Sequence, residues 1–252
     1  MSRTIRECPA GGAVPLYVHE DWHARFPFLV QGTTGRGEGN ADFDLGLFRD
    51  NTVGSAMARW RALRSATGMP SAVHARQVHG AHVLAHAALP PGLLIADDAD
   101  GHVTASPGIL LTISIADCVP IAIVAPDGSR AVAALHAGWR GVSGGVLEAG
   151  IDALRTLGAA MDTLWVHFGP AICGRCYEVG PEVHEALGLA RPDTNTPVDL
   201  RAVLADRALR AGVPDAQISS SAWCTRCDSE HFFSHRGGSG GRQMSVIGMR
   251  AD

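Results

Sequence analysis

The clearest structural signal in this chain is the segment Ile109-Leu-Leu-Thr-Ile-Ser-Ile-Ala-Asp-Cys-Val-Pro-Ile-Ala-Ile-Val-Ala-Pro-Asp-Gly-Ser-Arg-Ala-Val-Ala-Ala-Leu135. It contains three apolar runs, at 109–115, 121–125 and 131–135, and each has the length and composition of a buried strand. Pro126-Asp127-Gly128-Ser129 joins the last two runs. This connection is too short for a crossover helix and has the chemistry of a hairpin turn. The segment therefore predicts a sheet with antiparallel pairing at its centre.

The rest of the chain mixes strand and helix patterns, which predicts an α/β (α+β) fold. Further strands are expected at Val14–Val18, Phe28–Gly32, Ala72–Val78, His82–His86, Thr163–Phe168, Gln217–Ser221, Phe232–His235 and Gln243–Ile247. Apolar residues at helical spacing predict one helix near 53–64, one after an N-cap at Asp199, and one after an N-cap at Ser143. No repeat or linker divides the chain, so we expect one domain over residues 1–252.

Composition excludes several kinds of mechanism. The chain has 252 residues, of which 46% are hydrophobic and 18% charged, enough for one sizeable core. Its 21 basic residues are all arginine. Without a side-chain amine, a lysine Schiff base and a Walker A lysine are both excluded. Any anion must be held by arginine, histidine, backbone N–H groups or a metal.

Charge and hydropathy bear on partners and location. The net charge of −4 comes without a long run of either sign, so we expect no nucleic-acid partner. No apolar window approaches the ~18 residues of a membrane span, and no apolar stretch follows the N-terminal charges. We expect a cytoplasmic protein with no membrane partner.

The chain has six cysteines, too few and too unevenly spaced for a disulfide scaffold. Four form two C-x-x-C pairs, Cys173/Cys176 and Cys224/Cys227. Such pairs are a zinc signal, but 48 residues from Cys176 to Cys224 exceed the ~15–20 of a compact zinc ribbon. The spacing favours buried free thiols over a structural zinc site, and whether the pairs meet is left open.

Three polar motifs follow predicted strands, at Gln77–Gly80, Ala116–Pro120 and His136–Gly141. Strand ends are where a sheet presents functional groups to a cleft. Within these motifs His79, Cys118 and His136 would form a His₂Cys set that suits a catalytic zinc with an open position. The spacing matches no local metal motif. Histidines satisfied by local hydrogen bonds, a buried thiol, and a nucleophilic Cys118 activated by His136 all remain alternatives.

A glycine-rich turn, Gly138–Gly145, leads into the predicted third helix. Such a turn, with Arg140 beside it and Ser143 at the helix start, is a candidate phosphate or carboxylate site. The simpler interpretation is a tight turn with no ligand.

Taken together, the motifs resemble the YfiH family, also called the multicopper polyphenol oxidoreductase or laccase-domain family, whose members are described as purine nucleoside phosphorylases. The resemblance runs in order from about Phe28 to Ile247. Its motifs are Gln77-Val-His-Gly80, Ala116-Asp-Cys-Val-Pro120, His136-Ala-Gly-Trp-Arg-Gly141, Gly169-Pro-Ala-Ile-Cys-Gly-Arg-Cys-Tyr-Glu-Val-Gly180, Cys224-Thr225, Phe233-Ser-His-Arg236 and Gly241-Arg242.

The resemblance implies a mixed-sheet sandwich of the YfiH type with flanking helices. It also implies a metal held by His79, Cys118 and His136, with zinc as the first choice and copper as the alternative. The implied reactions are phosphorolysis of adenosine, inosine or methylthioadenosine to base and pentose 1-phosphate, and hydrolytic deamination of adenosine. The partners are then a purine nucleoside and phosphate.

Catalytic and substrate roles follow from this activity. Asp117 and Glu178 are the candidate carboxylates for proton transfer, although each could instead cap a loop or a helix start. The candidate substrate and phosphate ligands are Gln77, Arg140, Ser143, Arg236 and Arg242. His235-Arg236-Gly237 replaces the family's usual Tyr-Arg-Arg, and the N-terminal Thr-Thr-Arg pattern is altered at Gly32–Arg36, which leaves substrate preference open.

Three other functions are kept as alternatives: a copper-dependent polyphenol oxidase, a cysteine or zinc hydrolase that edits peptidoglycan precursors, and a binding module without catalysis. The sequence does not determine the physiological substrate, the choice between zinc and copper, or the oligomeric state.

Overall fold

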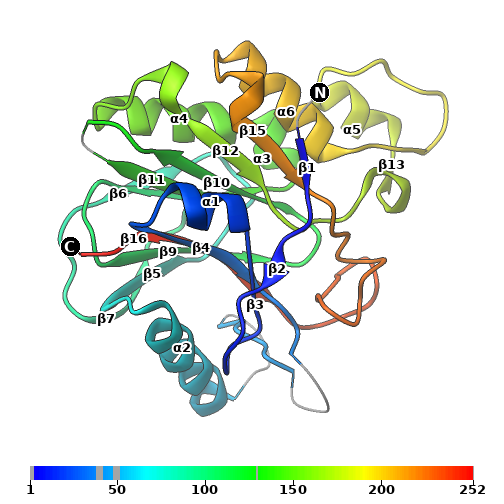
Figure 1. The fold of residues 1–252 in the computed structure, drawn as a ribbon. Coiled ribbons are helices and arrows are strands. Elements are labelled where there is room, and N and C mark those ends of the chain that lie inside the picture. Colours follow the sequence, from blue (N-terminus) through cyan, green and yellow to red (C-terminus); the bar gives the residue numbers. More distant parts are fainter. Residues whose placement is uncertain (1–2, 38–41, 48–51, 129, 252) are drawn as a thin grey trace.

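The protein is built from two mixed seven-stranded sheets packed face to face (Figure 1). The computed structural model describes residues 3–37, 42–47, 52–128 and 130–251. The first sheet, called the β10 sheet, has the order β1 (Arg3–Ile5), β15 (Ile218–Ser221), β12 (Trp165–Phe168), β10 (Val119–Ala125), β11 (Ala131–Ala137), β8 (Gly101–Thr104) and β6 (Val83–His86). The second, called the β9 sheet, has the order β2 (Cys8–Pro9), β3 (Leu16–Val18), β4 (Leu29–Thr34), β16 (Gln243–Met249), β9 (Ile109–Ile115), β5 (Ser71–Ala75) and β7 (Gly92–Ala96).

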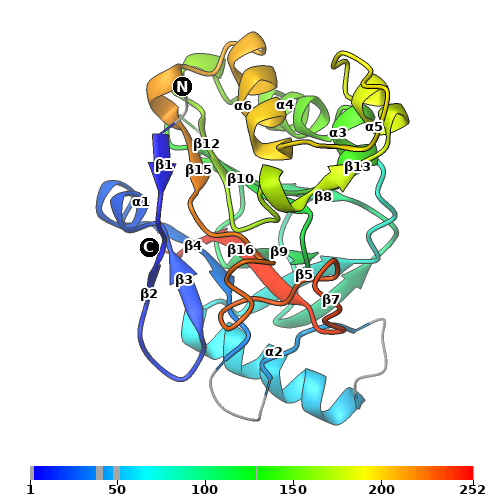
Figure 2. The same cartoon turned by 90° about the vertical axis from the view of Figure 1, so that its right-hand side faces the viewer.

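Helices cover the outer face of each sheet (Figure 2). The β10 sheet is covered by α3 (Trp139–Ser143), α4 (Val146–Thr156), α5 (Pro181–Ala186) and α6 (Leu200–Arg210), whereas α2 (Val53–Thr67) lies against the β9 sheet. The remaining elements are α1 (Glu20–Arg25), a β13 (Glu178–Val179) to β14 (Thr196–Pro197) pair, and 3-10 turns at Met161–Thr163, Gly174–Cys176 and Asp215–Gln217.

Strand β10 illustrates why the central runs are uniformly apolar. Ile121 and Ile123 belong to the core beneath the helices, and Ala122 and Val124 belong to the core between the sheets. Because successive side chains of a strand point to opposite faces, a strand buried on both faces has no polar alternation.

Most of the expected elements are present. Strand 109–115 is found with those bounds, and β10 and β11 form the expected antiparallel hairpin, with Ala125 opposite Ala131. Ser129 of the predicted turn lies outside the described residues. Asp199 is the N-cap of α6, where its side chain accepts a hydrogen bond from the Arg201 N–H.

Two local expectations were wrong. Ser143 ends α3 and caps nothing, because α4 begins after Gly145, whose left-handed φ of 84° turns the chain between the two helices. Phe232–His235 is not a strand. The Gln243 side chain takes the place of a strand partner there, since it accepts a hydrogen bond from the Phe233 N–H and donates one to the Phe233 carbonyl.

Within the described part of the chain, none of the helices combines the length and the apolar character needed to cross a bilayer.

The N-terminal segment passes from one sheet to the other, and a buried carboxylate holds it there. Glu7 lies between β1 and β2 and is only 2% exposed. Its carboxylate bonds His167 Nε2 at 2.8 Å and accepts the Ser221 hydroxyl at 2.7 Å. Burial alone would raise the pKa of Glu7, but the hydrogen bond and charge of His167 outweigh it and lower that pKa below its ordinary 4.5.

We expect Glu7→Ala to lower the free energy of unfolding by about 3 kcal/mol at neutral pH, because it leaves His167 and Ser221 buried without their partner. Since the pKa is lower in the folded state, the Glu7 contribution is present above pH 4.5 and is lost as the pH falls through the folded-state pKa. Urea unfolding of both proteins at neutral pH and at decreasing pH below 4.5 measures this. The difference between them should shrink with acid, and Glu185→Ala, at an exposed ion pair, should change little at any pH.

Candidate active site

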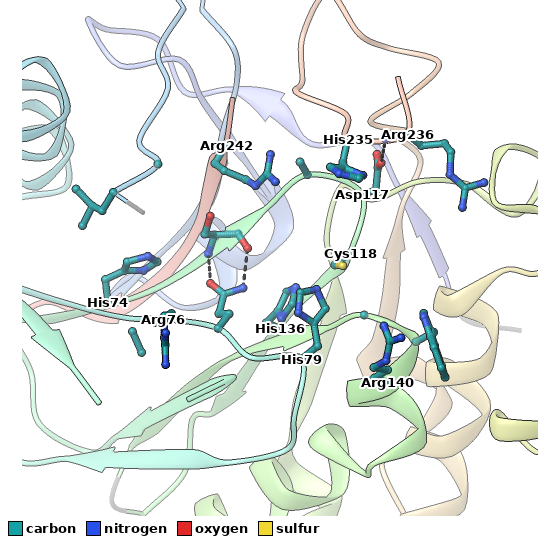
Figure 3. Close-up of a pocket in the computed structure, with 18 of the residues that line it drawn as sticks. His74, Arg76, His79, Asp117, Cys118, His136, Arg140, His235, Arg236 and Arg242 are labelled. Carbon is teal, nitrogen blue, oxygen red and sulfur yellow. Dashed lines mark hydrogen bonds between the residues drawn. The ribbon is translucent and has the colours of Figure 1, made fainter. Parts of the chain in front are cut away.

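One cavity of about 570 Å³ gathers most of the candidate residues (Figure 3). Its volume is in the range of small-molecule sites. Its lining consists of Gly46, Leu47, His74, Ala75, Arg76, Gln77, His79, Ser114, Ala116, Asp117, Cys118, His136, Gly138, Trp139, Arg140, Tyr177, His235, Arg236 and Arg242.

His79, Cys118 and His136 converge in this cavity. One donor atom from each lies within 4.8 Å of the others, and the two imidazole ring centroids are 4.9 Å apart. The β10–β11 hairpin explains part of the convergence: its register places Pro120 opposite His136, so that Cys118 comes just before β10 and beside β11. His79 arrives from the loop after β5, in the other sheet. Two imidazoles and a thiol are donors that suit zinc or copper.

A fourth residue, Asp100, which no sequence motif indicated, holds the His136 ring and the backbone of His79 in place. Its carboxylate has no exposed surface. Oδ1 accepts hydrogen bonds from His136 Nδ1 and the His79 N–H, both at 2.9 Å, and Oδ2 accepts the N–H groups of Val78 and Gly80 at 3.2 and 2.7 Å. With Nδ1 bound to Asp100, the nitrogen that His136 offers to a metal is Nε2, an arrangement typical of histidine ligands.

The electrostatics of Cys118 and His136 favour a thiolate beside an imidazolium. Burial would raise the pKa of Cys118, but His136 and His79 outweigh it and lower that pKa from 9.0 to about 6. Burial would lower the pKa of His136, but Cys118 and Asp100 raise it from 6.5 to about 9. The same pair suits metal ligation and nucleophilic catalysis, since both use the thiolate.

Asp117 joins the cavity to the loop between β15 and β16, residues 222–242, called the C-terminal loop. It is 8% exposed, and its backbone has a φ of 89°. Its Oδ1 accepts the Thr225 hydroxyl and its Oδ2 accepts the Arg236 N–H, both at 2.6 Å. Among the described non-glycine residues, only Asp117 and His79, with a φ of 61°, have positive φ, and both lie in this cavity. Positive φ is unfavourable for non-glycine residues and is found preferentially at functional sites.

The other sequence candidates fall into two groups. Gln77 lines the cavity, but its amide is bonded at both ends to the Ser114 backbone, at 2.8 and 2.7 Å. Glu178 and Ser143 are exposed and do not line the cavity. The expectation that Ser143 starts a helix pointing at an anion is therefore not met, and α3 is too short to replace it.

Four arginines line the cavity (Figure 3). Arg140 and Arg236 lie on one side of the His79, Cys118 and His136 group, and Arg76 and Arg242 lie on the other. Arg76 is paired with Asp98, whereas the Arg140 guanidinium stacks 4.3 Å from the Trp139 ring with no ion pair among the described residues. Tyr177 and His235 also line the cavity; they lie within the sequence motifs, but the motifs indicate no role for them. Arg76 lines the cavity as well and lies in none of the motifs.

The two C-x-x-C pairs also meet. The sulfur atoms of Cys173, Cys176, Cys224 and Cys227 all lie within 4.8 Å of one another. The segment between the pairs contains α5, α6 and β15, which bring the chain back to the first pair. This four-cysteine cluster has donors that could hold a metal ion, and it is separate from the His₂Cys group.

Gly138 lies against the His₂Cys group, and we expect Gly138→Ala to weaken zinc binding roughly tenfold or more. A Cβ there would lie 3.0 Å from His79 Cδ2 and 3.1 Å from Cys118 Sγ, so both donors would have to move. The φ of −75° suits any residue, so the effect is steric rather than conformational. Competition with a chromophoric chelator measures the affinity. Gly54→Ala, where a Cβ meets nothing within 4 Å, is the control, and equal affinities for the two variants would contradict the prediction.

Comparison with known proteins places this geometry in a family. Residues 31–250 match the family described as "Multi-copper polyphenol oxidoreductase laccase". A purine nucleoside phosphorylase of Xylella fastidiosa (strain Temecula1) is 38% identical over 183 residues, covering 67% of this chain and 68% of that protein. "Adenosine deaminase RL5", from an unknown prokaryotic organism, is 38% identical over 148 residues, covering 54% of this chain and 56% of that protein.

The fold expectation is confirmed by a solved structure. The crystal structure of YlmD from Geobacillus stearothermophilus has a TM-score of 0.87 and 28% identity, covering 97% of this chain and 100% of that one.

Proposed function

The chain belongs to the family described as multi-copper polyphenol oxidoreductase laccases, and we propose that it is a zinc-dependent purine nucleoside phosphorylase that also deaminates adenosine. The names of its relatives support both reactions, since one is a purine nucleoside phosphorylase and another an adenosine deaminase. In the first, phosphate and a nucleoside give a free base and pentose 1-phosphate. In the second, water and adenosine give inosine and ammonia.

The observation that carries the proposal is the composition of the cavity. It places the His₂Cys group among four arginines with Asp117 as the one carboxylate of its described lining. A surplus of guanidinium groups suits a dianionic substrate, because arginine binds phosphate oxygens through paired N–H donors. The volume of about 570 Å³ accommodates a nucleoside together with phosphate.

The His₂Cys donor set fits a metal ion on three counts: the donors converge, Cys118 favours its thiolate, and Asp100 fixes the orientation of His136. When bound there, zinc supplies Lewis acidity and lowers the pKa of a bound water toward ~7. The chain's own residues provide the remaining functions.

In phosphorolysis, Arg140 and Arg236 are placed to hold phosphate on one side of the cavity. A phosphate oxygen forms a bond to C1′ of the pentose, and the C1′–N9 bond breaks, with its electron pair passing to the purine. The departing base then takes up a proton. Arg140 is the arginine best placed for this role, because Trp139 orients it and no carboxylate in the described chain neutralises it.

In deamination a carboxylate must pass a proton to the departing amine. Asp117 is the carboxylate we propose, because it lines the cavity and each oxygen keeps one lone pair beyond its bond to Thr225 or Arg236. Glu178 lies outside the cavity, where its backbone carbonyl accepts a hydrogen bond from Arg236.

Incubation of the purified protein with adenosine, with and without phosphate, tests the proposal. Chromatography should detect adenine only when phosphate is present, and inosine under both conditions. Inosine alone would leave only the deaminase. Absence of both products, with zinc bound, would contradict the proposed function.

A second candidate is the phenol oxidation that the family description implies. The His79, Cys118 and His136 group is the one metal-competent cluster with imidazole donors in the described chain, which gives a single site. A multicopper site needs a more histidine-rich ligand set. Oxygen uptake with a phenol and added copper, abolished in His79→Ala, would favour this candidate.

The third candidate uses Cys118 as a nucleophile, as in a hydrolase acting on peptidoglycan precursors. The lowered pKa of the Cys118 thiol and the neighbouring His136 are also what a nucleophilic cysteine requires. An active, metal-free enzyme that loses activity when Cys118 is alkylated would establish it. Zinc that is bound in the wild type and lost in Cys118→Ser would instead favour Cys118 as a metal ligand.

A further inference from the structure

We propose that Cys173, Cys176, Cys224 and Cys227 bind a structural zinc ion, separate from the His₂Cys group, that ties the C-terminal loop to the wall of the cavity. The inference is independent of the proposed function, since it rests on the cysteine cluster and its hydrogen bonds alone.

The donors are arranged for a closed tetrahedral site. All four sulfur atoms lie within 4.8 Å of one another, and Cys176 and Cys227 approach to 3.4 Å. In a tetrahedral site with Zn–S bonds of about 2.3 Å, the sulfur atoms are about 3.8 Å apart, so small side-chain movements would suffice. Four thiolates leave no position for water or substrate, which is the arrangement of structural rather than catalytic zinc. Soft sulfur donors exclude magnesium and calcium.

The surrounding backbone already stabilises thiolate charge. Cys224 Sγ accepts hydrogen bonds from the N–H groups of Cys173 and Cys227, at 3.2 and 3.4 Å. Each pair also carries an arginine directly before its second cysteine, Arg175 in one and Arg226 in the other. Four thiolates and one Zn²⁺ carry a net charge of −2, which these two cations oppose. The Arg226 guanidinium in addition donates to the Cys176 carbonyl at 3.2 Å, which joins the two pairs.

The position of the cluster gives the ion its role. The segments that carry the pairs run side by side at a bridge between Ala171 and Cys224, and the Thr225 N–H donates to the Ala171 carbonyl at 3.1 Å. Thr225 also holds Asp117, the residue before Cys118. One pair lies between β12 and β13 and the other in the loop between β15 and β16, so a zinc cross-link would fix these two segments together.

Metal analysis of the holoprotein, purified under reducing conditions, tests the proposal. We expect two zinc ions per chain in the wild type, and one in Cys176→Ser and in Cys227→Ser. His79→Ala should also hold one ion, because it loses the zinc of the His₂Cys group and keeps the zinc of the four-cysteine cluster. Cys8→Ser, which changes a cysteine on β2 outside the cluster, is the matched control and should keep both. If the His₂Cys group binds no zinc, the wild type should hold one ion, still lost in the Cys176 and Cys227 variants. Failure of the proposed function is thereby distinguished from failure of this inference.

Two further measurements keep the test valid if a variant fails to fold. Cobalt exchanged into the wild type should give an intense sulfur-to-cobalt charge-transfer band, retained in His79→Ala, with the d–d bands of a tetrahedral thiolate site. Loss of the ion in folded Cys227→Ser should lower the thermal midpoint by roughly 5–10 °C. The proposal is overturned if the wild type carries no zinc that depends on Cys176 and Cys227. A native disulfide between them, seen as the loss of two hydrogens in the non-reduced mass, would also overturn it.

Discussion

Asp100→Asn should lower zinc affinity by about 10- to 100-fold and reduce kcat/KM for nucleoside cleavage at least as much. The carboxylate accepts four N–H groups, and all four donors belong to the segment 78–80 or to His136. An asparagine side chain replaces one acceptor oxygen with an NH₂ group. That NH₂ group would lie within hydrogen-bond distance of N–H groups that are themselves donors, so no hydrogen bond could form there. Either the His136 ring or the loop that carries His79 must then move.

The neighbouring aspartate provides a matched control. Asp98 lies two residues away and pairs with the exposed Arg76. Asp98→Asn makes the same chemical change outside the His₂Cys group, so zinc affinity should stay close to wild type. Because Asp98 pairs with the cavity residue Arg76, its kcat/KM is expected only to fall less than that of Asp100→Asn. Chelator competition and steady-state kinetics measure the two quantities on all three proteins.

Asp100 acts through His79 and His136. A measurement other than stability is therefore needed to distinguish a positioning role from a purely structural one. The pKa of His136 is raised in part by its hydrogen bond to Asp100. In the metal-free protein, Asp100→Asn should therefore lower the pKa of His136, as followed by NMR titration, while Asp98→Asn should not. Wild-type zinc affinity and kcat/KM in a folded Asp100→Asn protein would show that Asp100 has no such role.

Arg140→Ala should reduce phosphate-dependent cleavage of adenosine by about 10²- to 10³-fold while zinc stays bound. Because the chain has no lysine, arginine is its side chain with a permanent positive charge for binding phosphate, and Arg140 is a cavity arginine with no ion pair in the described structure. Its guanidinium binds in the ground state and in the transition state, so KM for phosphate should rise as kcat falls.

The deaminase activity of Arg140→Ala shows whether the variant has lost phosphate binding or has a generally disturbed site, because deamination does not use phosphate. Inosine formation by Arg140→Ala should remain within a few-fold of wild type, and Arg140→Lys should restore phosphorolysis only in part, since an ammonium cannot form the paired contacts of a guanidinium. Arg155→Ala, which removes an exposed arginine of α4, is the control. Unchanged phosphorolysis in Arg140→Ala would remove this residue from the phosphate site.

Local patterns accounted for much of the fold. The runs 109–115, 121–125 and 131–135 became β9, β10 and β11, because apolar runs between turn residues report directly on buried strands. The strands β7 and β8 were missed, because Gly92–Ala96 is partly exposed and Gly101–Thr104 is short. The pattern at Phe232–His235 failed because the Gln243 side chain, in place of a neighbouring strand, bonds the Phe233 backbone there.

The candidate site divides in the same way. Sequence motifs indicated His79, Cys118 and His136, and the motifs' likeness to a known family connected them with zinc and with nucleosides. Asp100 could not be distinguished from Asp97 and Asp98 in the same segment. The three aspartates differ only in the folded protein, by the burial and the hydrogen-bond partners of their side chains.

The sequence by itself determined the central strands, the family, and the absence of any lysine chemistry, because these depend on local pattern and composition. Tertiary structure decided which groups meet. Pairing of β10 with β11 and packing of the two sheets bring His79, Cys118 and His136 together, and the return of the chain through α6 and β15 unites two cysteine pairs that are 48 residues apart. Such proximity depends on strand order and register, which local spacing along the chain does not encode.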